Sequence, residues 1–144
     1  MRDIQNTKTE LLKTYLYLKF DGICGLGSEG NLDVDFIIDE TKKNISKYGN
    51  VQALIFDFTN MSYTFGNRFL NLFKPNIFKN NKTIFISILI GSANMENWKS
   101  LIDYGNLDFD FYGSETSVFQ SELKGSIKSI NKRMNNKKRP PNNA

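Results

Sequence analysis

The sequence predicts a single α/β domain whose four- or five-stranded, mainly parallel sheet carries alternating helices on its faces. Segments with the apolar spacing of strands alternate along the chain with segments that have the apolar spacing of helices. Two of the strand-like segments are apolar on both faces, as is typical of central strands that helices cover on each side. The chain has 144 residues, of which 40% are hydrophobic, so it can bury one core of its own.

Each element follows from a local pattern. Apolar and polar side chains alternate in the first strand, and apolar residues recur at helical spacing before the stop at Gly49. Pro75 ends a short helix, and Ser114 is placed to cap the last helix, with Glu115 in its first turn. The predicted elements are a strand at 14–20, a helix at 32–48, a strand at 51–58, a short helix at 69–73, a strand at 83–90, a helix at 95–105, a strand at 107–112 and a helix from Ser114 to Met134.

This order predicts right-handed crossovers between parallel strands, with the strand at 51–58 in the middle of the sheet. The side chains that face inward under this arrangement form the predicted core. They are Leu16, Leu18, Ile37, Ile38, Leu54, Phe56, Ile84, Ile86, Ile88, Leu101 and Ile127.

Charge is unevenly distributed along the chain. Five of its 19 basic residues and none of its 15 acidic residues fall within residues 132–144. We therefore expect residues 1–131 to form the domain and residues 132–144 to be a basic, disordered tail. The domain itself is nearly neutral, and the tail has no aromatic residue that could stack on a base, so nucleic acid is not an expected partner.

The composition argues against several classes of protein. Histidine is absent and Cys24 is the single cysteine, which excludes Ser-His-Asp and Cys-His catalysis and a Cys/His zinc site. We therefore predict no catalytic residues, no metal and no cofactor. No apolar run is long enough to span a membrane, no signal peptide is recognisable, and an unpaired cysteine suits the cytoplasm, which is the expected location.

A glycine motif lies between the first strand and the first helix. Gly25, Gly27 and Gly30 match the GxGxxG pattern that binds dinucleotides, and Asp57 ends the next strand as a ribose-binding acid would. Acidic residues such as Glu29 crowd the helix start, where a phosphate needs positive potential. Binding of a nucleotide or acyl-CoA at this loop is therefore an alternative to a protein-binding function.

The segment from Leu54 to Leu70 resembles the central segment of STAS domains (sulfate transporter and anti-sigma factor antagonist). In that family a buried strand ends in Asp-x-Ser and leads to an Asp-Ser-Ser-Gly turn that begins a helix. Asp57, Thr59 and Met61 match the spacing, whereas the turn falls on residues 65–68, Phe-Gly-Asn-Arg, which lack the phosphorylatable serine. The resemblance implies the fold and a binding role, and it implies no phosphorylation switch.

These observations predict a non-enzymatic protein that binds another protein. The partner is a component of a regulatory, partner-switching system or, alternatively, a bacterial toxin that this chain neutralises as an immunity protein. The candidate docking residues follow the most buried strand, where loops have a rigid base. They are Asn60, Ser62, Tyr63, Thr64, Asn67 and Arg68. In the competing interpretation this loop is structural, with Tyr63 packed under the next helix and Arg68 paired with an acid such as Asp57.

Overall fold

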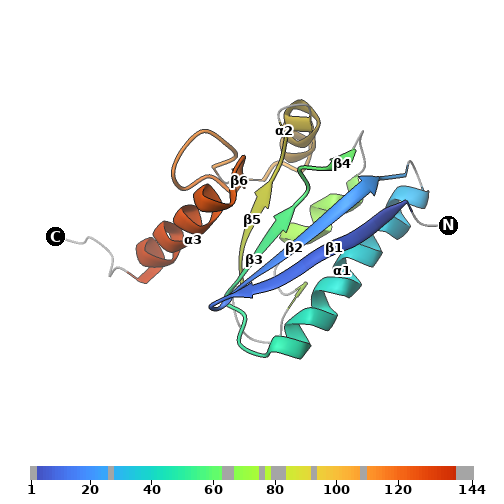
Figure 1. The fold of residues 1–144 in the computed structure, drawn as a ribbon. Coiled ribbons are helices and arrows are strands. Elements are labelled where there is room, and N and C mark those ends of the chain that lie inside the picture. The colour runs from blue at the N-terminus through green and yellow to red at the C-terminus, as the bar shows by residue number, and fades with distance from the viewer. Residues whose placement is uncertain are drawn as a thin grey trace.

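The computed structural model describes residues 3–25, 28–62, 67–74, 77–78, 84–91, 94–107 and 110–138. These residues form an α/β fold with a mixed, mostly parallel sheet (Figure 1). Its strands are β1 (Ile4–Leu12), β2 (Tyr15–Ile23), β3 (Ala53–Asp57), β4 (Met61–Ser62), β5 (Phe85–Leu89) and β6 (Phe119–Gln120). Its helices are α1 (Ser28–Tyr48), the 3₁₀ helix η1 (Asn67–Phe73), α2 (Met95–Tyr104) and α3 (Leu123–Lys138).

The sheet has the order β1-β2-β3-β5-β6, and the short β4 pairs with the end of β2. β1 and β2 are antiparallel, and every other pairing is parallel. β3 lies between β2 and β5, which confirms the predicted central position of the most apolar strand. The prediction of a mainly parallel α/β sheet is thus confirmed, although the described ranges contain six strands where four or five were expected.

The additional strand at the N-terminus is β1, which the sequence analysis assigned to no element. Ile4 is its one buried residue and the other positions are exposed or partly exposed, so apolar periodicity is weak there. Lys13 joins β1 to β2 with a positive φ of 59°, in a tight turn. β1 is an edge strand with an irregularity between Asn6 and Lys8, and a bulge of this kind discourages pairing with other chains.

The prediction for residues 107–120 was wrong. Residues 110–111 belong to no helix or strand and residues 112–116 form bends and a turn, in place of the predicted strand and helix start, and residues 108–109 lie outside the described part. The hydroxyl groups of Ser114, Thr116 and Ser117 all donate to the Asp110 carboxylate, which folds this segment into a compact turn. Ser114 therefore caps no helix. Phe119 lies in β6 and packs against other rings of the core, and α3 begins only at Leu123.

Helix α3 continues to Lys138 and so includes residues 132–138, which the sequence analysis assigned to a disordered tail. Three contacts account for the extension. Arg133 Nε donates to Ser129 Oγ at 3.1 Å, Met134 packs against the apolar cluster beneath the helix, and the Lys137 ammonium lies 5.6 Å from the centre of the Phe85 ring. Residues 139–144 lie outside the described part.

Two apolar clusters lie on opposite faces of the sheet. The larger joins the sheet to α1, η1 and α2, which pass behind it in Figure 1, and the smaller lies between the sheet and α3. Of the predicted core, eight residues are buried: Leu16, Leu18, Ile37, Ile38, Leu54, Phe56, Ile88 and Leu101. The other three, Ile84, Ile86 and Ile127, are partly buried against these clusters.

Candidate functional site

Asp57 ends β3 and is held by three internal hydrogen bonds. Its Oδ2 accepts from the Tyr17 hydroxyl, and its Oδ1 accepts from the Thr59 N–H at 3.0 Å and from the Thr59 hydroxyl at 2.6 Å. The carboxylate is buried, and both of its oxygens are engaged. Burial, followed by the bond to Asp57 and the nearby negative charge, raises the pKa of Tyr17 above its ordinary value. Asp57 thus acts as an internal anchor for the turn that follows β3.

The glycine motif before α1 is packed closely on itself. The Gly25 N–H donates to Asp33 Oδ2 at 2.8 Å, so this N–H is already used by an acid of α1. A Cβ added to Gly30 would lie 2.3 Å from the carbonyl oxygen of Gly25, which explains the glycine there by close packing. Burial and, second, the charge of Asp33 raise the pKa of the neighbouring Cys24 thiol to about 12. Gly27 lies outside the described residues.

Asn60 and Ser62 are held at the carboxyl edge of the sheet by strand β4. The Gly22 N–H donates to the Asn60 carbonyl at 3.3 Å, and the Cys24 N–H donates to the Ser62 carbonyl at 2.9 Å. These bonds fix the backbone, while the side chains of Asn60 and Ser62 remain exposed. Tyr63 and Thr64, the next two candidates, lie outside the described residues, as do the two residues after them.

Arg68 forms an ion pair with Asp35 of α1. Its Nη2 lies 3.1 Å from each carboxylate oxygen, and its Nε lies 3.2 Å from Oδ1. The partner expected in the structural interpretation was Asp57, which is engaged elsewhere. Both side chains are well exposed, Arg68 at 44% and Asp35 at 42%, so the pair lies on the surface between η1 and α1. Asn67, which precedes Arg68, is also exposed.

Two exposed apolar side chains that were not candidates from sequence lie near the carboxyl edge of the sheet. Ile23 is 62% exposed at the end of β2, where it pairs with Ser62 of β4. Leu32 is also 62% exposed and lies one helical turn before Asp35 on α1. We call the following set the carboxyl-edge surface: Ile23, Leu32, Asp35, Asn60, Ser62, Asn67 and Arg68. The sequence feature that could have indicated this surface is Leu32, an apolar residue on the otherwise polar side of the first helix.

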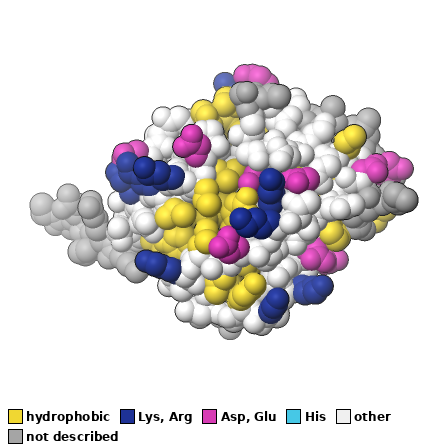
Figure 2. All heavy atoms as spheres, viewed as in Figure 1, with side chains coloured by type: hydrophobic (Ala, Val, Ile, Leu, Met, Phe, Trp, Pro, Cys, Tyr) yellow, Lys and Arg dark blue, Asp and Glu magenta, His cyan; other side chains and the backbone are white. Residues whose placement is uncertain are grey.

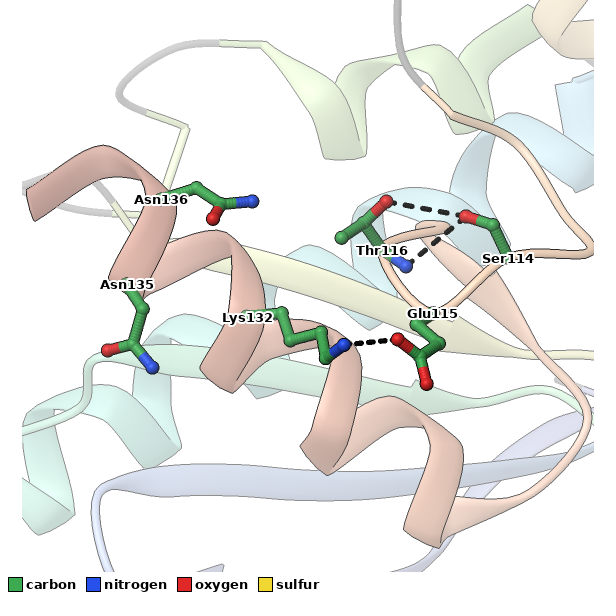
Figure 3. Close-up of a pocket in the computed structure, with 6 residues that line it drawn as sticks. All are labelled: Ser114, Glu115, Thr116, Lys132, Asn135 and Asn136. Carbon is green, nitrogen blue, oxygen red and sulfur yellow. Dashed lines mark hydrogen bonds and ion pairs between the residues drawn. The ribbon is translucent and has the colours of Figure 1, made fainter. Parts of the chain in front are cut away.

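A second surface lies on the other face of the sheet, beside α3, where hydrophobic side chains reach the surface among charged ones (Figure 2). The turn before β6 and α3 border an open cavity of about 740 Å³ there (Figure 3). It is lined by Ser114, Glu115, Thr116, Lys132, Asn135 and Asn136. The sequence analysis did not find this cavity, because it placed the turn inside a helix.

Glu115 bridges two lysines of α3 at this cavity. Its Oε1 lies 2.9 Å from Lys128 Nζ, and its Oε2 pairs with Lys132 Nζ. The hydrogen bonds from Lys132 and then Lys128 lower the pKa of Glu115 to about 2. The cavity therefore holds an ionised carboxylate that the chain itself supplies.

Comparison with known protein families, with curated proteins and with solved structures gave no match for this chain. The helices within the described ranges are too short or too polar to cross a membrane. The same ranges contain no group of three or more Cys, Asp or Glu side chains placed to hold a metal ion. The function must therefore be argued from the two surfaces themselves.

Proposed function

We propose that this chain is a non-enzymatic protein-binding module that docks its partner through the carboxyl-edge surface. The observation that carries the proposal is the exposure of two apolar side chains near the carboxyl edge: Ile23 at the end of β2, and Leu32 one helical turn before Asp35 of the Arg68–Asp35 ion pair. Apolar anchors surrounded by polar groups and an arginine are the composition of protein interfaces. A docked partner would bury the two apolar side chains and exclude water from the ion pair.

The backbone under this surface is firmly held. β4 is bonded to β2, Asp57 anchors the turn after β3, and the Arg68–Asp35 pair joins η1 to α1. A rigid base reduces the conformational entropy that is lost when a partner binds. The exposed side chains themselves contribute little to the core, so they are free to serve recognition.

The resemblance to STAS domains supports a regulatory role within this class. The Asp57-Thr59 pair stands at the end of the central strand, and a short helix begins at Asn67, where the family turn leads into its helix. We infer a partner-switching component from this resemblance. An immunity protein that neutralises a toxin belongs to the same binding class, and the identity of the captured partner decides between them.

The test is capture of proteins from the native extract on the immobilised chain, compared between three forms. Wild type and Tyr104→Ser should retain the same partner, because Tyr104 is an equally exposed side chain on α2, outside the carboxyl-edge surface. Leu32→Glu should lose that partner by at least tenfold with an unchanged melting temperature. Equal retention by all three forms would contradict the proposal.

A second measurement separates this function from ligand binding at the glycine motif. NAD, ATP and acyl-CoA are each added in a thermal unfolding experiment. A ligand at 100 times its dissociation constant adds about 2.7 kcal/mol to the free energy of unfolding. No shift is expected, because the Gly25 N–H is already bonded to Asp33. A clear shift with any of the three would overturn the proposal.

A further inference from the structure

The outer side of α3 carries lysines at a regular spacing. Lys124, Lys128 and Lys132 follow one another at intervals of four residues, which places them on one side of the helix over about 12 Å. All of α3, from Leu123 to Lys138, contains no acidic residue. The positive charge of this side is therefore not balanced within the helix.

The counter-charge comes from the turn before β6. Glu115 extends from this turn toward α3, where one carboxylate oxygen pairs with Lys128 and the other with Lys132. The three side chains are each about half exposed, so the ion pairs lie at the surface and are replaceable at small cost. Within the described residues Lys124 makes no ion pair, so the one carboxylate of Glu115 neutralises part of the charge of a row of three lysines.

The cavity extends the row by one further turn of the helix. Asn135 and Asn136 line it beyond Lys132, and both amides are exposed donors and acceptors. A volume of about 740 Å³ is within the range of sites that bind small ligands or a few residues of a peptide. Glu115 is the one acid among the side chains that line it.

We propose that this cavity and the lysine row bind an acidic segment of a partner protein, and that Glu115 is an internal competitor occupying the place of a partner carboxylate. Glu115 shows that a glutamate on a neighbouring turn of the chain can pair with both lysines. Further carboxylates of the segment would pair with Lys124 on one side and accept hydrogen bonds from the asparagines on the other. The inference rests on the proposed protein-binding function but places this contact on the opposite face of the sheet from the carboxyl-edge surface.

An acidic polypeptide suits this surface better than a nucleic acid. None of the side chains that line the cavity is aromatic, so bases have nothing to stack on. The chain outside α3 has 13 basic and 15 acidic residues, so the basic surface is confined to this one helix and no wider footprint for phosphates surrounds it.

The test measures binding of a fluorescein-labelled hexaglutamate peptide by anisotropy at low ionic strength. Glu115→Gln should bind at least threefold more tightly than wild type, because both lysines lose their internal partner while the side-chain volume is kept. The double variant Lys128→Ala/Lys132→Ala should bind at least tenfold more weakly. Raising the salt concentration should weaken binding in every form.

Matched control variants remove one carboxylate or two lysine charges from other parts of the chain. Glu96→Gln on α2 and the double variant Lys42→Ala/Lys99→Ala change exposed residues far along the chain from α3, and both should stay within twofold of wild type. The proposal is overturned if Glu115→Gln binds no more tightly than wild type, if neither binds, or if the control variants change affinity as much as the α3 variants. It is also overturned if hexauridylate RNA binds more tightly than the peptide.

This experiment uses no natural partner, so its result is independent of capture from the extract. If Leu32→Glu retains the partner while Lys128→Ala/Lys132→Ala loses the peptide, only the carboxyl-edge proposal is contradicted. If the peptide results fail while Leu32→Glu loses the partner, the inference about α3 fails alone.

Discussion

The two faces of the sheet are packed with different kinds of side chain. On the face of α1, η1 and α2, aromatic rings contact one another through the core, as when Phe58 stacks on Trp98 with centroids 5.5 Å apart. On the face of α3, the apolar cluster around Ile55 is smaller, and hydroxyl groups interrupt it. Ser87 of β5 and Ser126 of α3 lie 2.6 Å apart there. One face is therefore joined by apolar packing and the other partly by hydrogen bonds.

This difference suggests separate roles for the two faces. Burial of large aromatic side chains is the main source of folding free energy, whereas a hydrogen bond between neutral groups adds about 1 kcal/mol net. The aromatic face should hold the domain together and give the carboxyl-edge surface its rigid base. The α3 face should contribute less stability, which leaves α3 more able to change its contacts when a partner binds.

The largest expected effect compares two neighbours on β3 that point to opposite faces. Phe56 and Ile55 are both fully buried. Phe56→Ala should lower the free energy of unfolding by about 3–5 kcal/mol, because it leaves a cavity among packed rings. Ile55→Ala should cost about 2–3 kcal/mol, near the low end for such a deletion. Urea unfolding measures both, and equal losses would remove the distinction between the faces.

The next effect tests the polar part of the α3 face. Tyr17→Phe removes the hydroxyl that donates to the buried Asp57 carboxylate, and it should cost about 1–3 kcal/mol of unfolding free energy. Tyr15→Phe is the matched control on the same strand, because the Tyr15 hydroxyl donates to Asn131 at an exposed position. The control should cost less than about 1 kcal/mol. A reversal of this order would show that the buried bond to Asp57 contributes little.

Alkaline pH provides a third test of the same pair. Tyr17 has a raised pKa when folded, whereas in the unfolded chain it ionises near 10.0. Its contribution to stability is therefore complete below about pH 10, and above that pH this contribution falls by about 1.4 kcal/mol per pH unit. The comparison is made in a Tyr15→Phe/Cys24→Ala background, because the Tyr15 hydroxyl, whose pKa is also raised by burial, and the Cys24 thiol, with a pKa of about 12, titrate in the same range. Adding Tyr17→Phe should flatten the curve, and an unchanged slope would contradict the assignment.

The smallest expected effect concerns the surface ion pair. Arg68→Ala should lower the free energy of unfolding by less than about 1 kcal/mol, because Arg68 and Asp35 are both well exposed. The same variant should weaken capture of the partner at the carboxyl-edge surface by at least fivefold. A stability loss above about 2 kcal/mol with unchanged capture would show that the loop is structural, as in the competing interpretation.

Much of the fold could be predicted from sequence, because β2, β3, β5, α1 and α2 each carry a strong apolar pattern. β1 has one buried residue, Ile4, and only weak apolar periodicity, so its strand character comes from pairing with β2. Phe119 fits a helical spacing with Leu123, but its ring belongs to the aromatic core, and that contact places it in β6. Such tertiary contacts override the secondary-structure preference of the local sequence, and the spacing of apolar residues does not reveal them.

The position of the candidate site in the fold could be predicted from sequence, but the side-chain contacts of its residues could not. Asn60, Ser62 and Arg68 lie at the carboxyl edge, as expected from their place after the central strand. The choice of Asp35 as the partner of Arg68 depends on how α1 lies against η1. The cavity at α3 depends on Glu115 crossing to Lys128, which requires the turn that Asp110 organises. Both features combine residues far apart in the sequence.

The central claim is that the aromatic face of the sheet contributes more stability than the α3 face. Native-state hydrogen exchange tests it most directly, since it measures the opening free energy of each element in one folded sample. Amides of β3, at Leu54–Phe56, should exchange only through global unfolding. Amides in the middle of α3, at Ser126–Ile130, should open at least about 1 kcal/mol more easily, because hydrogen bonds and a small cluster hold this helix. Equal opening free energies for β3 and α3 would contradict the account, since both faces would then belong to one cooperative unit.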